Sequence, residues 1–402
     1  MDNPYLAVKA QWLAKITRAL EVKAEFQETA DECMRFFNGP YDFLYQLKPF
    51  TARGDFVYAG PDDFPRPSFC MTVNKVAEAV QLFGPVLYHR NPVRRVNPRQ
   101  QAPLPLSLLG DPNDPMTQVM YQAMTQSAGQ RTAGAQGRAG LLESYLNWTP
   151  TALDLKAHNR RAIDECIIKG MGVCWHEIYQ PKGAQFKTVG SFYDTVDNLV
   201  LDPDLETMDG AKWCARRFVR PVWEVEMEFG LEPGALKGMY ESHSTQATLS
   251  ETDLVRHYRN MGVTNDLITY WKVYSKMGMG SLLQGIAQDE VVREVDRFGQ
   301  FCYLAVTPGC EYPLNLPPSS WEDEEQMMQR VQWDTPFWAD DAWPFTALIF
   351  HEIPRKIWPQ SHFKPALGEL KFINWAFSFM ASKMSRASKD FIALQDGMDE
   401  EF

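Results

Sequence analysis

Apolar side chains near the C-terminal end of the chain recur at every third or fourth position. This spacing places them on one face of a helix that packs against another helix. A second apolar stripe (Phe372, Trp375, Phe379) lies beside the first, so a single neighbour cannot cover the helix. We expect a long helix over 364–388, packed either within one chain or against copies of itself in a ring. The residues expected at such inter-subunit contacts are Leu370, Ile373, Phe377, Met380 and Met384.

Shorter patterns occur along the rest of the chain. The apolar run 345–350, between Pro344 and Pro354, predicts a buried strand. Helical and strand-like segments follow one another without a regular βαβ alternation or an internal repeat, which indicates an α+β fold. We predict helices over 5–38, 70–83, 116–126, 141–146, 152–169 and 222–229, and strands over 173–179, 199–201, 211–220, 267–276 and 300–306.

Two segments are predicted to lack regular secondary structure. Residues 127–140 (SAGQRTAGAQGRAG) are small and weakly hydrophobic, which predicts a flexible linker. Residues 308–342 read as a long loop with an acidic patch and several tryptophans.

Length and composition set broad limits. A chain of 402 residues can hold two or three domains, and its apolar and charged contents are typical of a water-soluble protein. No apolar stretch is long enough to suggest a membrane span, and the first residues lack the pattern of a secretory signal. The seven scattered cysteines fit reduced, mostly buried thiols in the cytoplasm.

A net charge of −11 argues against a protein that grips nucleic acid over much of its surface, but it allows a local basic patch. On the long helix the candidates for contact with DNA phosphates are Lys371, Lys383, Arg386 and Lys389. They contact DNA only if the helix lines a channel; otherwise their charged ends reach solvent beside the apolar stripes. A second basic segment, 87–96 (LYHRNPVRRV), is either a solvated edge or a contact for phosphate or an acidic partner.

Motifs for catalysis, cofactors and metals are incomplete. His176-Glu177 and His351-Glu352 lack the second histidine of a zinc-protease helix, so we interpret these histidines as structural. The acidic turn at Asp202 lacks the glycine and the closing glutamate of a calcium loop. No phosphate-binding loop or nucleophile elbow is present. We therefore assign no catalytic, cofactor-binding or metal-binding residue, and expect that the protein is not an enzyme.

One enzymatic alternative remains open. A cytoplasmic hydrolase or transferase with an unrecognised site would use carboxylates near Asp202 or Glu322. The tryptophans of 308–345 would then form a ligand platform, whereas in a structural protein they belong to the core or to subunit packing. They are Trp321, Trp333, Trp338 and Trp343.

The order of segments resembles the portal, or head-to-tail connector, proteins of tailed bacteriophages. The stretch AEFQETADECMRFFNG resembles the family's opening helix, and RRAIDECIIKGMGVCWHEIY its early body. The stretch VDNLVLDPDLETMDGAKWCARRFVRPVWEVEMEFG is similar to a strand, acidic turn, strand and short helix of portals. The final sixty residues resemble the segment of portals that leads into the stem helix, together with the first part of the clip.

This resemblance implies a portal-type fold. Residues 1–363 would form the wing body of helices and antiparallel strands, 364–388 the stem helix and 389–402 the start of the clip. The second stem helix and the crown of such proteins are not in this sequence.

The resemblance also implies partners. Subunits would form a ring, commonly a dodecamer, at one vertex of the capsid, and double-stranded DNA would pass through its centre during packaging and ejection. The terminase large subunit would dock on the clip and head-tail adaptor proteins would replace it, while major capsid and scaffold proteins would meet the wing. The protein would belong to the virion, after assembly in the host bacterial cytoplasm, and would have no contact with a membrane.

Overall fold

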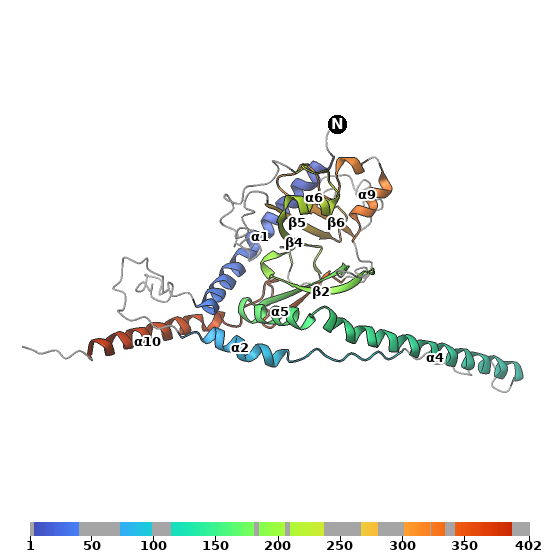
Figure 1. Ribbon diagram of the computed structural model, residues 1–402, viewed down its shortest axis with the longest axis horizontal. Coiled ribbons are helices and arrows are strands. Elements are labelled where there is room, and N and C mark those ends of the chain that lie inside the picture. The colour runs from blue at the N-terminus through green and yellow to red at the C-terminus, as the bar shows by residue number, and fades with distance from the viewer. Residues whose placement is uncertain are drawn as a thin grey trace, which may run out of the picture.

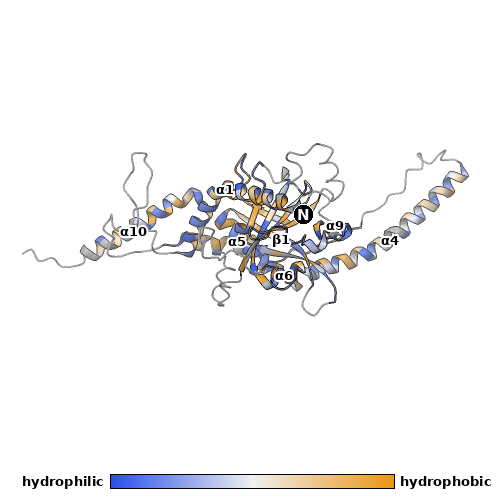
Figure 2. Cartoon of the chain, turned by 90° about the horizontal axis from the view of Figure 1, so that it is seen from above, coloured by the Kyte–Doolittle hydropathy of each residue, from blue (hydrophilic) through white to orange (hydrophobic). Residues whose placement is uncertain are grey.

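The chain folds into two antiparallel sheets surrounded by helices, which confirms the predicted α+β class. A computed structural model describes residues 4–39, 73–98, 114–180, 185–205, 210–236, 267–279, 301–321, 323–333 and 342–387. Two long helices, α4 (Pro115–Ala152) and α10 (Leu367–Ala387), extend in opposite directions from a body that holds both sheets (Figure 1 and Figure 2).

The smaller sheet joins segments that lie far apart in the sequence. Its order is β2-β1-β7, with β1 in the centre and both pairings antiparallel. Trp175 of the central strand lies opposite Phe192 on one side and Phe345 on the other. The last strand is followed by residues 350–366 and then by α10, so this sheet lies just before that helix in the chain. The bounds are β1 (Met171–Tyr179), β2 (Thr188–Asp194) and β7 (Phe345–Ile349).

The larger sheet has the order β3-β4-β5-β6, again fully antiparallel. Helices α6 (Val222–Phe229) and α9 (Glu324–Val331) pack near it, and the 3-10 helices η2 (Val196–Asn198) and η4 (Pro318–Ser320) lie in its connections. Strands were predicted at all four places. Their bounds are β3 (Leu199–Leu201), β4 (Trp213–Pro221), β5 (Leu267–Ser275) and β6 (Cys302–Val306).

Helix α1 (Pro4–Asn38) runs along the whole body and contributes to three apolar clusters in turn (Figure 1). Trp12 is buried against the larger sheet, and Phe26 stacks on Trp358 near the smaller one. Phe36 then packs with α2 (Lys75–Leu87), α5 (Leu155–Lys169) and the start of α10. The apolar residues that predicted this helix therefore pack in three different clusters along its length.

The prediction of a flexible linker over 127–140 was wrong, because these residues lie inside α4. The helix starts at Pro115, and Asp114 caps it by accepting hydrogen bonds from the backbone N–H of Met116 and Thr117. Alanine, glutamine and arginine favour helix, and here they outweigh the cost of the glycines. The helix also continues through Pro150 and ends only before Asp154, whose φ of 47° is left-handed.

The segment 308–342 was predicted as one long loop, and this was also wrong in part. It contains η4 and α9, and the α9 N-terminus is capped by the carboxylate of Asp323. Only three of its eight residues (Met327, Met328 and Val331) are apolar, too few to establish a period in the sequence. The six cysteines that the structure describes are buried free thiols, and Cys70 lies outside the described residues.

Candidate functional site

Helix α10 is anchored at its beginning and projects from the body along the rest of its length (Figure 1). It follows the 3-10 helix η6 (Lys364–Ala366), and Phe363 and Leu367 on either side are buried in the cluster formed by α1, α2 and α5. Leu370 packs against the same cluster. Of the five residues predicted for inter-subunit packing, this one is therefore already partly covered within the chain.

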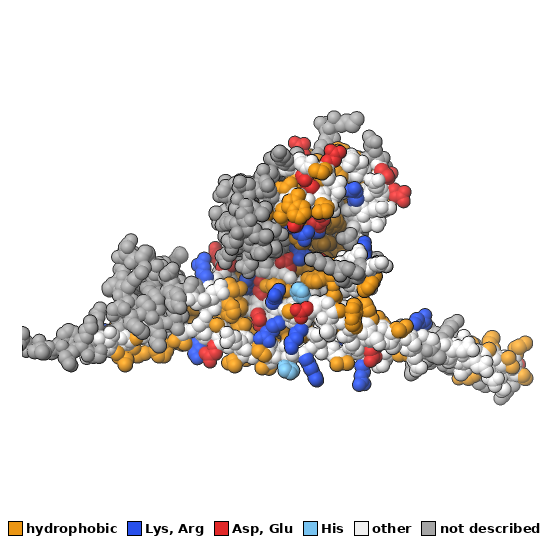
Figure 3. Space-filling view, viewed as in Figure 1, with side chains coloured by type: hydrophobic (Ala, Val, Ile, Leu, Met, Phe, Trp, Pro, Cys, Tyr) orange, Lys and Arg blue, Asp and Glu red, His pale blue; other side chains and the backbone are white. Residues whose placement is uncertain are grey.

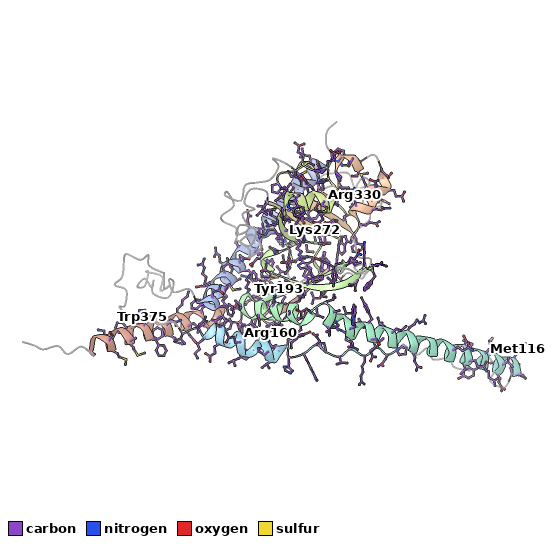
Figure 4. All side chains as sticks on the ribbon, in the orientation of Figure 1. Met116, Arg160, Tyr193, Lys272, Arg330 and Trp375 are labelled. Carbon is purple, nitrogen blue, oxygen red and sulfur yellow. The ribbon has the colours of Figure 1, made fainter. Side chains whose placement is uncertain are left out.

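The other side chains of the two apolar stripes are exposed. Trp375 stacks on Phe379 with ring centroids 5.5 Å apart and lies beside Phe372 at 5.9 Å, so these three rings form a continuous surface (Figure 4). We call the exposed apolar residues of this helix the α10 apolar surface. They are Phe372, Ile373, Trp375, Phe377, Phe379, Met380 and Met384.

Beyond Leu370, the described side chains of α10 that are buried are polar, whereas a surface helix usually buries apolar ones. Asn374 is only 2% exposed and Ser378 is fully buried. The side-chain carbonyl of Asn374 accepts a hydrogen bond of 2.7 Å from the backbone N–H of Val73. The helix thus buries these two polar residues and exposes seven large apolar ones.

The basic residues proposed to contact DNA from this helix differ in their surroundings. Lys371 forms an ion pair with Glu32 of α1 and lies 6.0 Å from the ring of Phe36, so its charge is already used within the chain. Lys383 is exposed, with its ammonium 5.5 Å from the ring of Phe379. The side chain of Arg386 and the whole of Lys389 lie outside the described residues.

The acidic turn considered for a hydrolytic site makes structural contacts. Asp202 is buried and accepts a hydrogen bond from the backbone N–H of Asp204. Asp204 forms an exposed ion pair with Arg18 of α1, at 2.9 Å. Glu206 and Glu322 lie outside the described residues.

The three described tryptophans of 308–345 make contacts within the body. Trp321 donates a hydrogen bond to the carbonyl of Leu316, and Trp333 donates one to the carbonyl of Cys302. Trp343 lies 5.9 Å from Trp333, ring to ring. Trp338 lies outside the described residues.

The two candidate histidine motifs form hydrogen bonds to other side chains. His176 lies between the hydroxyls of Ser191 and Thr346, one on each neighbouring strand of the smaller sheet, at 2.8 Å and 2.7 Å. His351 shares a 2.8 Å hydrogen bond with His362, just before α10 begins. Among the residues that the structure describes, no group of three or more His, Cys, Asp or Glu side chains is arranged to hold a metal ion.

A buried ionic cluster, which sequence reasoning missed, joins α1, α5 and η2. Lys169 lies between the carboxylates of Glu165 and Asp197, at 3.0 Å and 2.6 Å, and its side chain is 6% exposed. Burial alone would lower the pKa of Lys169, but the two carboxylates raise it. The Glu165 and Lys169 pair, four residues apart inside an apolar stretch, is the sequence signal that could have indicated it.

Lys23 of α1 completes this cluster. Its ammonium donates to the backbone carbonyls of Val196, Asp197 and Leu199, at 2.7 to 3.0 Å. Burial lowers the pKa of Lys23 to about 7, although Asp197 opposes this shift. Burial opposes the charge of Asp197 as well, but Lys169 and Lys23 lower the pKa of Asp197 to about 2. The cluster fixes α1 to the junction of the two sheets.

The low pKa of Lys23 predicts that the contribution of this residue to stability rises with pH. Between about pH 7 and pH 10, unfolding adds a proton to Lys23, so raising the pH favours the folded state, by on the order of 1–4 kcal/mol. Lys23→Met should remove this rise, as measured by urea unfolding at pH 7, 8.5 and 10. Lys75→Met, at an exposed position, should retain it. Equal pH dependence in the two variants would contradict the assignment.

No family model and no curated protein matches this chain. The resemblance to portal proteins therefore stays a prediction that rests on the quoted stretches. In the described part of the chain, no helix is both long enough and apolar enough to cross a membrane.

Proposed function

We propose that this chain is the subunit of a portal ring of a tailed bacteriophage, a structural conduit for double-stranded DNA and not an enzyme. The ring would occupy one capsid vertex and contact major capsid and scaffold proteins. It would dock the terminase large subunit during packaging and a head-tail adaptor afterwards. The order of the sequence segments supports this proposal, and one structural observation supports it further.

That observation is the α10 apolar surface. Seven large apolar side chains are exposed on this helix, whereas Asn374 and Ser378 are buried. Clustered exposed apolar surface marks an interaction site, since each large side chain gains about 1.5–3 kcal/mol when it is fully buried. A second copy of the chain is a suitable partner because a head-to-tail contact, repeated around an axis, covers the same surface on every subunit.

The test replaces Phe377 and Met380 with glutamine in the full-length protein. Both side chains are exposed in the single chain, so the fold should survive. Removing two apolar side chains from each interface should weaken assembly by about 100-fold or more. Mass photometry and end-on electron micrographs should show rings for the unmodified protein and monomers for the variant at the same concentration.

The matched control replaces Trp223 and Met227 of α6, which are exposed to a similar extent on another helix. This variant should form the same rings as the unmodified protein. An unmodified protein that stays monomeric at every salt concentration would contradict the proposed ring. Rings that survive the Phe377 and Met380 changes would contradict the role of α10.

A further inference from the structure

A pocket of about 180 Å³ lies between α1 and the loop that joins β7 to α10. Its walls come from α1, from the turn that follows β3 and from the loop itself. Three cations of the loop segment, Arg355, Lys356 and Lys364, line the pocket together with the carboxylate residue Glu25 of α1. We call it the basic pocket.

Arg355 has a backbone conformation that is unusual for its residue type. Its φ is 65°, and it follows Pro354 in a turn closed by a hydrogen bond of 3.1 Å from the backbone N–H of Lys356 to the carbonyl of Ile353. Glycine is favoured at this turn position, because a Cβ atom makes a left-handed φ costly. Among the described residues, the only other non-glycine with such a φ is Asp154, and aspartate tolerates it better than arginine does. A strained arginine that lines a pocket indicates a role for its side chain.

The cations of the pocket are only partly neutralised within the chain. Lys356 pairs with Glu25 at 3.0 Å, and its hydrogen bond and charge, together with the charge of Lys364, lower the pKa of this carboxyl. Arg355 and Lys364 form no ion pair with any residue that the structure describes. Lys169 also reaches the pocket, but the buried ionic cluster already neutralises it. Three cations against one carboxylate leave a local charge of +2 on a chain whose net charge is −11.

The pocket also has an apolar wall. Phe26 and Trp358, stacked with ring centroids 5.0 Å apart, form its buried part, and Val22 remains 47% exposed. Other basic side chains, such as those gathered over α5 in Figure 3, lie on an open face with acidic ones among them. The basic pocket therefore combines a hollow, cations and an apolar contact in one place.

We propose that the basic pocket binds a small phosphomonoester. A phosphomonoester is close to a dianion at pH 7.5, which matches the local charge of +2, and the guanidinium of Arg355 can donate two parallel hydrogen bonds to its oxygens. Lys356 and Lys364 supply two further charges, and the organic group covers Val22. The volume is below the roughly 300–1,000 Å³ of sites for drug-sized ligands, which indicates a ligand of about one ring. This site is separate from the α10 apolar surface and does not rest on the proposed ring.

The test titrates phenyl phosphate into the full chain at pH 7.5 and follows binding by isothermal titration calorimetry. Phenyl phosphate should bind at one saturable site, at least tenfold more tightly than inorganic phosphate, which lacks the apolar group, or phenol, which lacks the charge. Absence of saturable binding up to about 10 mM would overturn the site. Inorganic phosphate that binds as tightly as phenyl phosphate would overturn the organic ligand.

Three variants test the named side chains. Arg355→Gly should weaken binding at least tenfold, whereas the urea midpoint of unfolding should stay the same or rise, because glycine relaxes the turn. Lys364→Gln leaves the turn unchanged and should also weaken binding. Glu25→Gln removes the competing carboxylate and should tighten binding. Unchanged affinity in both Arg355→Gly and Lys364→Gln would overturn the assignment, as would a lower urea midpoint of Arg355→Gly with unchanged binding.

The matched control is Arg138→Gln, which removes an exposed cation of α4 and changes the net charge equally. This variant should keep the affinity of the unmodified protein. Equal weakening in Arg138→Gln and Arg355→Gly would overturn the site, because the effect would then come from net charge alone. Mass photometry of the same samples separates this inference from the proposed ring, since monomers that bind the probe would support the pocket and contradict only the ring.

Discussion

Lys169→Met should lower the free energy of unfolding by about 3–5 kcal/mol, because it leaves two carboxylates buried without their nearest cation. The side chains of Glu165 and Asp197 are 3% and 12% exposed, so water cannot replace the missing ammonium. Methionine has a similar length, which limits the effect of changed packing. Urea unfolding at pH 7, followed by circular dichroism, measures the change in stability.

The control for this prediction is Lys75→Met, which removes an exposed ion pair with Glu78 and should cost at most about 1 kcal/mol. A similar cost for the two substitutions would contradict the role of the buried cluster.

Acid titration of the same variants gives a second test of the buried cluster. Because the pKa of Asp197 is about 2, below its unfolded value near 3.9, its stabilising contribution is present above pH 4 and is lost as pH falls toward 2. That decline should be smaller in Lys169→Met, because Lys169 is the main cation that lowers this pKa.

Gly172→Ala should destabilise the protein by about 4 kcal/mol or more, or prevent folding altogether. A Cβ atom at this position of β1 would lie 1.9 Å from the carbonyl oxygen of Ala162 and 2.7 Å from its carbonyl carbon. Both atoms belong to the backbone of α5, so no side-chain rotation relieves the clash. The helix would have to move away from the sheet and expose buried residues such as Ile163 and Cys166. Urea unfolding and the yield of folded protein measure the effect.

Gly140→Ala is the matched control, and its effect should have the opposite sign. No atom lies within 4 Å of the added Cβ, and the residue is inside α4. Alanine should stabilise the helix by about 0.5–1 kcal/mol. If Gly172→Ala unfolded at the same urea concentration as the unmodified protein, the close packing of α5 on β1 would be wrong.

Helices and strands with a clear apolar period over neighbouring residues could be predicted from the sequence. The long apolar periods of α1 and α10 and the short strands β1, β3 and β5 predict elements near their observed places. Predictions made from composition alone failed. The small residues of 127–140 predicted a linker, but in the structure these residues lie inside α4. The apolar pattern also failed for α9, where only three of eight residues are apolar.

The candidate surfaces needed more than a local pattern. Two stripes on one helix indicated a need for neighbours, but the sequence could not say that the chain itself covers only Leu370 and leaves the rest exposed. Lys371 is a candidate channel cation by sequence, whereas the fold places Glu32, 339 positions away, beside it.

The sequence by itself determined the fold class and most of the element types, together with the apolar character of the last helix, because these depend on neighbours within a few turns or strand residues. Tertiary structure decided which charges are neutralised, since Lys23, Lys169 and Lys371 find their partners across elements distant in sequence. It also decided that α10 buries Asn374 and exposes its aromatic residues. The physical reason is that burial and ion pairing depend on distance in space, and only the long-range pairing of β1 with β7 and the packing of α1 set those distances.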